Sequence, residues 1–122
     1  MTASKRIAAA LAATALVAGV HFSSGRAADP IEGNGRDLVM FTMTGSNVYG
    51  ANQIRGAEEE AKKLGYTLTV FQHNFSQPEQ DQQVQQYIAS GAKPAAIIFW
   101  PWVADAAVND VRQLSKLAPV IQ

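Results

Sequence analysis

The sequence has no cysteine and no excess charge of either sign. The absence of cysteine excludes disulfide bonds, thiol catalysis and cysteine metal sites, so the hydrophobic core must hold the fold. Ten Lys and Arg residues balance ten Asp and Glu residues, which leaves no basic character of the kind that nucleic-acid binding requires. His73 has no partner at metal-ligand spacing, because the only other histidine is His21. We therefore expect neither a nucleic-acid partner nor a metal site.

The common catalytic and cofactor motifs are also missing. Residues 33–38, GNGRDL, contain G-x-G, but they precede the first strand and lack the third glycine of a dinucleotide-binding loop. Residues 44–47, TGSN, have neither the lysine nor the glycine spacing of a phosphate loop. No G-x-S-x-G motif is present, and no pair of acids stands at the strand ends. We therefore expect no catalytic residue, no cofactor and no enzyme activity.

The longest apolar run lies at the amino terminus. Residues 7–20 make a run of 14, short of the roughly 20 residues that span a bilayer. Lys5 and Arg6 precede it and small residues follow it, which is the order of a secretory signal peptide. Residues 1–27 are thus a predicted signal peptide that is cut near Ala27, with a membrane anchor as the alternative interpretation. The exported chain is expected in the periplasm, without membrane insertion.

Cleavage after Ala27 changes the charge of the chain. The leader contains three basic residues and no acid, so residues 28–122 carry a net charge of −3. Residues 28–36 are rich in Gly, Asp and Asn and predict a flexible lead-in. Residues 37–122 then form the predicted domain.

Strand-like and helix-like segments alternate along this domain. Runs of apolar and β-forming residues predict strands at 38–43, 67–72, 95–100 and 118–122. Apolar residues at helical spacing predict helices at about 49–64, 76–91 and 107–114. Ser76 and Glu79 form a capping box, and Gly65 supplies a left-handed helix end. The order β-α-β-α-β-α-β indicates an α/β fold, a Rossmann-like parallel sheet with helices on both faces.

Amides, hydroxyls and aromatic rings gather where the predicted strands end. In parallel α/β sheets, ligands bind outside the carboxyl ends of the strands. Amides donate and accept hydrogen bonds at once, which suits a ligand with many hydroxyls, and flat rings suit the C–H faces of a sugar. The sequence therefore predicts a site for a monosaccharide or similar polyol, composed of Asn47, Tyr49, His73, Asn74, Trp100 and Trp102.

Several of these residues also have a purely structural interpretation. Asn47 is a suitable helix N-cap, Tyr49 can pack against its own helix, and Trp100 can belong to the core. Trp102 follows a proline at a strand end, where burial is harder, which favours a site or an interface. Binding and structural roles therefore stay open for the first three residues.

The chain resembles the amino-terminal part of type I periplasmic binding proteins, in the ribose-binding-like group of sugar ABC-transporter receptors. The resemblance covers residues 37–122 and rests on residues 45–66, 68–91 and 95–101, which read GSNVYGANQIRGAEEEAKKLGY, LTVFQHNFSQPEQDQQVQQYIASG and AAIIFWP. It implies two α/β lobes, joined by a hinge, that close over a sugar and deliver it to a membrane permease. Family members are more than twice as long, so we expect this chain to be a partial N-terminal lobe.

The resemblance also implies roles for single residues. Asn47 and Tyr49 match an asparagine and an aromatic that often contact the sugar. A second aromatic commonly follows, but here Gly50 stands in its place. Trp100 replaces a residue that is often a polar sugar contact, which puts ribose itself in doubt, and Trp102 can compensate as a stacking surface.

Two other functions stay open from the sequence. A ligand-sensing regulatory domain of the same fold is one alternative, although the leader and the lack of a helix-turn-helix before the domain oppose it. An exported α/β enzyme with catalytic residues beyond residue 122 is the other, and no residue of this chain supports it.

Overall fold

A computed structural model describes residues 32–122 of the chain. The predicted signal peptide, its cleavage site and His21 lie outside the described residues. The Gly33 N–H donates to the Leu64 carbonyl at 2.6 Å, which ties the segment before β1 to the end of α1. The elements follow in the order β1 (Asp37–Met43), α1 (Val48–Lys63), β2 (Thr67–His73), α2 (Gln77–Ala89), β3 (Ala96–Phe99), α3 (Val108–Leu114) and β4 (Val120–Ile121).

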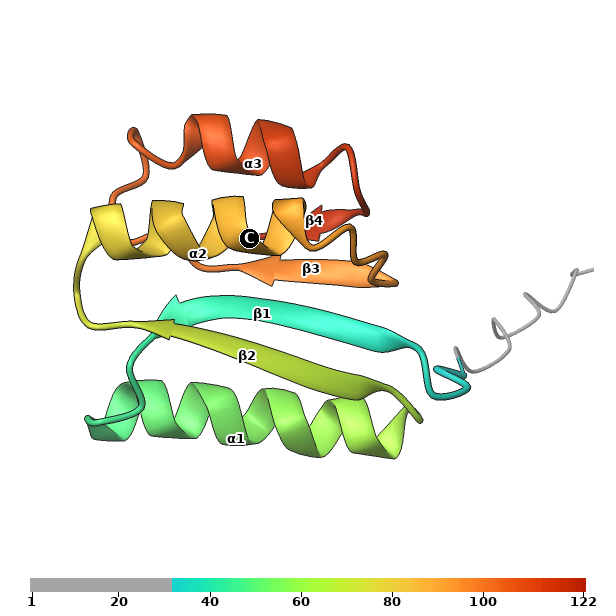
Figure 1. The fold of residues 1–122 in the computed structure, drawn as a ribbon. Coiled ribbons are helices and arrows are strands. Elements are labelled where there is room, and N and C mark those ends of the chain that lie inside the picture. Colours follow the sequence, from blue (N-terminus) through green and yellow to red (C-terminus); the bar gives the residue numbers. More distant parts are fainter. Residues whose placement is uncertain (1–31) are drawn as a thin grey trace, which may run out of the picture.

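The strands form one parallel sheet in the order β2-β1-β3-β4. Helix α1 covers one face of the sheet, whereas α2 and α3 cover the other (Figure 1). The predicted α/β fold, with its parallel sheet and helices on both faces, is confirmed. No helix within residues 32–122 is both long and apolar enough to cross a lipid bilayer.

Strand β1 is the centre of the core. Its residues Val39–Thr42 are all buried, as the continuous apolar run predicts for a strand covered on both faces. Phe41 stacks on Phe71 of β2 with ring centroids 5.0 Å apart, and it meets the edge of Tyr87 of α2 at 5.7 Å. On the opposite face, the Thr42 hydroxyl donates to Gln53 Oε1 of α1 at 2.7 Å. Both helical layers are therefore anchored to this one strand.

The predicted helix ends are present in the structure. The Asn47 side chain accepts a hydrogen bond from the Gly50 N–H at 2.9 Å, and the Ser76 hydroxyl accepts one from the Glu79 N–H at 3.3 Å. Glu79 reaches back to the N–H of Asn74 rather than to that of Ser76. Gly65 has a φ of 76°, the left-handed conformation expected at a helix end. These caps fix where α1 and α2 begin, directly beside the carboxyl ends of β1 and β2.

Gly50 is required by the close approach of α1 to the turn before it. A Cβ atom at this position would collide with the carbonyl oxygen of Thr44, and Gly50 is buried. Gly56 lies six residues later on the same helix, and a Cβ there would meet no atom within 4 Å. The absence of a second aromatic after Tyr49 therefore has a packing reason, because no side chain fits at residue 50.

We expect Gly50→Ala to destabilise the chain by about 1–3 kcal/mol, because the new methyl group forces the turn away from α1. Gly56→Ala is the matched control and should stabilise the chain by about 0.5–1 kcal/mol, since alanine favours the helix and fits the open space. Urea unfolding followed by circular dichroism measures both changes. Equal effects of the two substitutions would contradict the packing role of Gly50.

Candidate functional site

The six predicted site residues all lie at the carboxyl edge of the sheet. Asn47 and Tyr49 follow β1, His73 and Asn74 end and follow β2, and Trp100 and Trp102 follow β3. These strands are parallel neighbours, so their ends meet at one edge, which is on the left in Figure 1. We call this edge, with the loops that leave it, the rim.

The aromatic residues of the rim form two groups. Tyr49 and Trp100 lie edge to face with ring centroids 6.2 Å apart, on the side of the sheet that α1 covers. Trp102 lies on the α2 side, with its ring centroid 5.9 Å from that of His73 and 5.3 Å from that of Phe75. The rim therefore carries one aromatic group on each side of the sheet.

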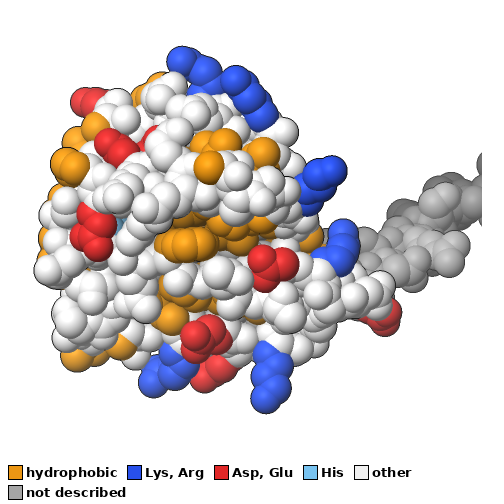
Figure 2. Space-filling model, viewed as in Figure 1, with side chains coloured by type: hydrophobic (Ala, Val, Ile, Leu, Met, Phe, Trp, Pro, Cys, Tyr) orange, Lys and Arg blue, Asp and Glu red, His pale blue; other side chains and the backbone are white. Residues whose placement is uncertain are grey.

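Four of these aromatic residues present large areas to solvent. Tyr49 is 57% exposed, Phe75 is 43% exposed, Trp102 is 41% exposed and Trp100 is 40% exposed. Hydrophobic side chains are also visible along this side of the molecule in the space-filling view (Figure 2). Exposed aromatic side chains that gather in one place are a feature of binding surfaces rather than of ordinary solvated surfaces.

Asn47 has a structural role that leaves part of its side chain available. Its Oδ1 caps α1, as described above, while its Nδ2 makes no hydrogen bond within residues 32–122. The residue is only half-buried. Its amide nitrogen is thus an available donor at the rim, next to the exposed Tyr49.

His73 is buried rather than exposed. The side chain is 1% exposed, and neither ring nitrogen has a hydrogen-bond partner in the described part of the chain. Burial lowers its pKa, and the nearby charge of Glu79 opposes this shift only in part. The imidazole is therefore mainly neutral at pH 7, and its ring packs against that of Trp102. It does not face solvent as a ligand contact would.

Phe75 is a rim residue that the sequence-based site did not include. Its φ is +54°, a left-handed conformation that is rare for an aromatic residue. The preceding residue, Asn74, is exposed, and its backbone N–H donates to Glu79 Oε2 at 2.8 Å, which holds the turn. The strained turn places the Phe75 ring against Trp102. The signal in the sequence was a bulky apolar residue directly before a helix cap, where burial is difficult.

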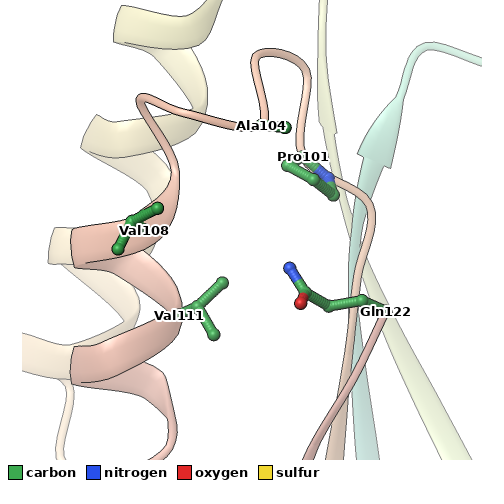
Figure 3. Close-up of a pocket in the computed structure, with 5 residues that line it drawn as sticks. All are labelled: Pro101, Ala104, Val108, Val111 and Gln122. Atoms are coloured by element: carbon green, nitrogen blue, oxygen red, sulfur yellow. The ribbon is translucent and has the colours of Figure 1, made fainter.

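A hollow of about 360 Å³ lies beside the rim, between α3 and the ends of β3 and β4. Its lining is Pro101, Ala104, Val108, Val111 and Gln122 (Figure 3). Val108 and Val111 project from α3 toward the side chain of Gln122. None of the six predicted residues lines this hollow, although Pro101 separates the two tryptophans.

The described residues offer no metal centre. No group of three or more His, Asp and Glu side chains within residues 32–122 is placed to hold a metal ion. The notable acidic feature is a pair of carboxyl groups, Asp81 of α2 and Asp110 of α3. Asp110 is 4% exposed, and its pKa is raised to about 6. Burial is the main cause, followed by the hydrogen bond to Asp81 and its charge.

This carboxyl pair makes stability depend on pH. The folded chain holds a proton on Asp110 at pH values where the unfolded chain has lost it, so folding is favoured at low pH. The contribution is complete below about pH 4 and is lost as the pH rises through about 6. Above that pH, two negative charges face each other between α2 and α3.

We expect Asp110→Asn to stabilise the chain at pH 7.5 by about 1–3 kcal/mol, because the substitution removes the buried charge. The gain should shrink at pH 5, where Asp110 of the wild-type chain is protonated. Urea unfolding at the two pH values measures this difference. Asp105→Asn is the control, since Asp105 is exposed. A gain for Asp110→Asn that is the same at both pH values would show that Asp110 does not titrate as described.

Comparisons with known proteins support the fold. No protein-family model matches the sequence, and no curated protein matches it. Among solved structures, the chain is similar to an ABC transporter solute-binding protein from Mycobacterium smegmatis, crystallised with bound glycerol. The TM-score is 0.62 and the sequence identity is 16%, and the match covers 70% of this chain and 30% of that chain. The chain thus spans less than a third of that protein and has the fold of the matching part.

Proposed function

We propose that this chain is part of the exported solute-binding component of an ABC transporter, and that its rim binds a monosaccharide or similar polyol. The observation that carries the proposal is that exposed Tyr49, Trp100 and Trp102 lie along one edge of the sheet with the Asn47 amide nitrogen, which makes no hydrogen bond within residues 32–122. Rings and amides, without an acid at the same positions, are suited to hold a sugar rather than to cleave it. The fold likeness to a solute-binding protein crystallised with glycerol, itself a polyol, agrees with this chemistry.

The rim by itself can cover only one side of a ligand. Tight small-molecule sites enclose most of the ligand surface, and the rim rings are open to solvent along the edge of the sheet. We therefore infer that a second α/β lobe completes the site by closing over the rim, and that the closed protein delivers its ligand to a membrane permease in the periplasm.

Titration calorimetry against a panel of monosaccharides and polyols tests the proposal. We expect the receptor that contains this chain and a second lobe to bind at least one of them, and the 122-residue chain alone to bind weakly or not at all. The absence of heat with every polyol in the two-lobed receptor would contradict the proposed ligand class. Micromolar affinity of the isolated chain would contradict the need for a second lobe.

In the two-lobed receptor, Trp102→Ala and Asn47→Ala should each weaken binding by about 1–3 kcal/mol, through lost ring contact and an unpaired ligand hydroxyl. Asn47→Ser separates binding from folding, because serine also caps a helix but lacks the amide nitrogen. Val103→Ala is the control, since Val103 is an exposed apolar residue of the same loop outside the predicted site. Wild-type affinity in both alanine variants of the site would remove these residues from it.

A further inference from the structure

Helix α2 is rich in glutamine, and the proposed function does not by itself require this. Six of its residues are glutamine, at positions 77, 80, 82, 83, 85 and 86. Gln77, Gln80 and Gln83 are spaced by three residues, and each forms a hydrogen bond to the backbone near the end of β2 or in the loop after β3. Gln82 and Gln86 are exposed. One side of α2 is thus directed at the rim.

Gln80 connects both tryptophans of the rim. Its Nε2 donates to the Trp100 carbonyl at 2.9 Å, and its Oε1 accepts from the Trp102 N–H at 3.1 Å. Pro101 lies between them and has no N–H of its own. A single side-chain amide therefore satisfies the two backbone groups that flank this proline.

Gln77 and Gln83 extend the same arrangement. Gln77 Oε1 accepts from the Val103 N–H at 2.8 Å, while its Nε2 donates to Asp81 Oδ1 at 2.6 Å. Gln83 Nε2 donates to the Gln72 carbonyl at 2.8 Å. Gln80 and Gln77, both from α2, therefore hold backbone atoms of the Trp100–Val103 loop, while Gln83 holds the end of β2.

The two hydrogen bonds of Gln80 offset the cost of burying its amide group. Its side chain is 0% exposed, and burial of an amide is unfavourable unless both its oxygen and its nitrogen are paired. Among neutral side chains, only Asn and Gln offer a carbonyl acceptor and an N–H donor on one planar group. Gln80 also holds the loop without placing a charge beside the rim.

We propose that Gln80 is a positioning residue that orders the Trp100–Trp102 turn and thereby fixes both tryptophan rings of the rim, with Gln77 holding the end of the same loop. The statement that these rings then receive a ligand rests on the proposed function. The ordering of the loop by Gln80 does not.

The chain provides its own probe, because Trp100 and Trp102 are its only two tryptophans. Gln80→Met keeps the length of the side chain but removes both hydrogen bonds. In the ligand-free 122-residue chain, we expect acrylamide to quench tryptophan fluorescence about 1.5- to 2-fold more strongly in Gln80→Met than in the wild type. Trp100 and Trp102 are 40% and 41% exposed in the structure, and release of the loop would expose more of both side chains. Near-ultraviolet circular dichroism from the tryptophans should weaken, while the far-ultraviolet spectrum stays unchanged.

Gln82→Met is the matched control on the exposed side of α2 and should leave quenching at the wild-type value. Gln77→Met is a milder variant that retains the Gln80 bonds, and it serves as the test if Gln80→Met does not fold. Gln77→Met should raise quenching above the wild-type value, but by less than the roughly 1.5- to 2-fold expected for Gln80→Met, because it releases only the Val103 end of the loop. If Gln80→Met folds, wild-type quenching and a wild-type near-ultraviolet signal would overturn the proposal. If only Gln77→Met folds, wild-type values in that variant would overturn it.

Ligand titration of the two-lobed receptor separates this proposal from the proposed function. Increased quenching in Gln80→Met supports the positioning role whether or not any sugar binds to the receptor. If the receptor binds a sugar, Gln80→Met should weaken that affinity about 5- to 50-fold, since the rings must be ordered at the moment of binding. A loss of equal size in Gln82→Met would overturn the link between Gln80 and the ligand.

Discussion

The burial of β1 on both faces is the constraint on which the rest of the molecule depends. Val39–Thr42 are enclosed by helices on either side, and each fully buried large apolar side chain contributes about 1.5–3 kcal/mol. Both neighbouring strands pair with β1 in parallel. Three strands therefore end at the same edge, and residues that are far apart in the sequence meet there. The rim is a consequence of this core and not a separate structure.

The placement of α1 and α2 on opposite faces of the sheet divides the rim into two groups (Figure 1). The carboxyl end of β1 is therefore bordered by α1 on one side and by α2 on the other. Trp100 packs with Tyr49 at the start of α1, while Trp102 packs with His73 and Phe75 near the start of α2. Gln80 reaches from α2 to the backbone of both tryptophans and joins the two groups.

Much of the fold was predictable because its signals are local. The apolar run at 38–43 showed a strand covered on both faces, and Asn47, Ser76 and Gly65 each act at the helix ends where the sequence placed them. The edge on which the six predicted site residues lie also followed from the alternation of strands and helices. The burial of His73 did not follow, because it depends on Trp102, 29 positions away. The role of Gln80 was equally hidden, since its partners lie 20 and 22 residues further along the chain.

The proposed function accounts for two features of the rim that the fold alone does not require. Tyr49, Trp100 and Trp102 leave large apolar areas in water, and Phe75 is held at the same edge by a strained turn. Under the proposed function, both features serve contact with a ligand. A loop that Gln80 and Gln77 hold in place would then lose little conformational freedom on ligand binding, and the affinity would depend on how well a second lobe closes over the rim.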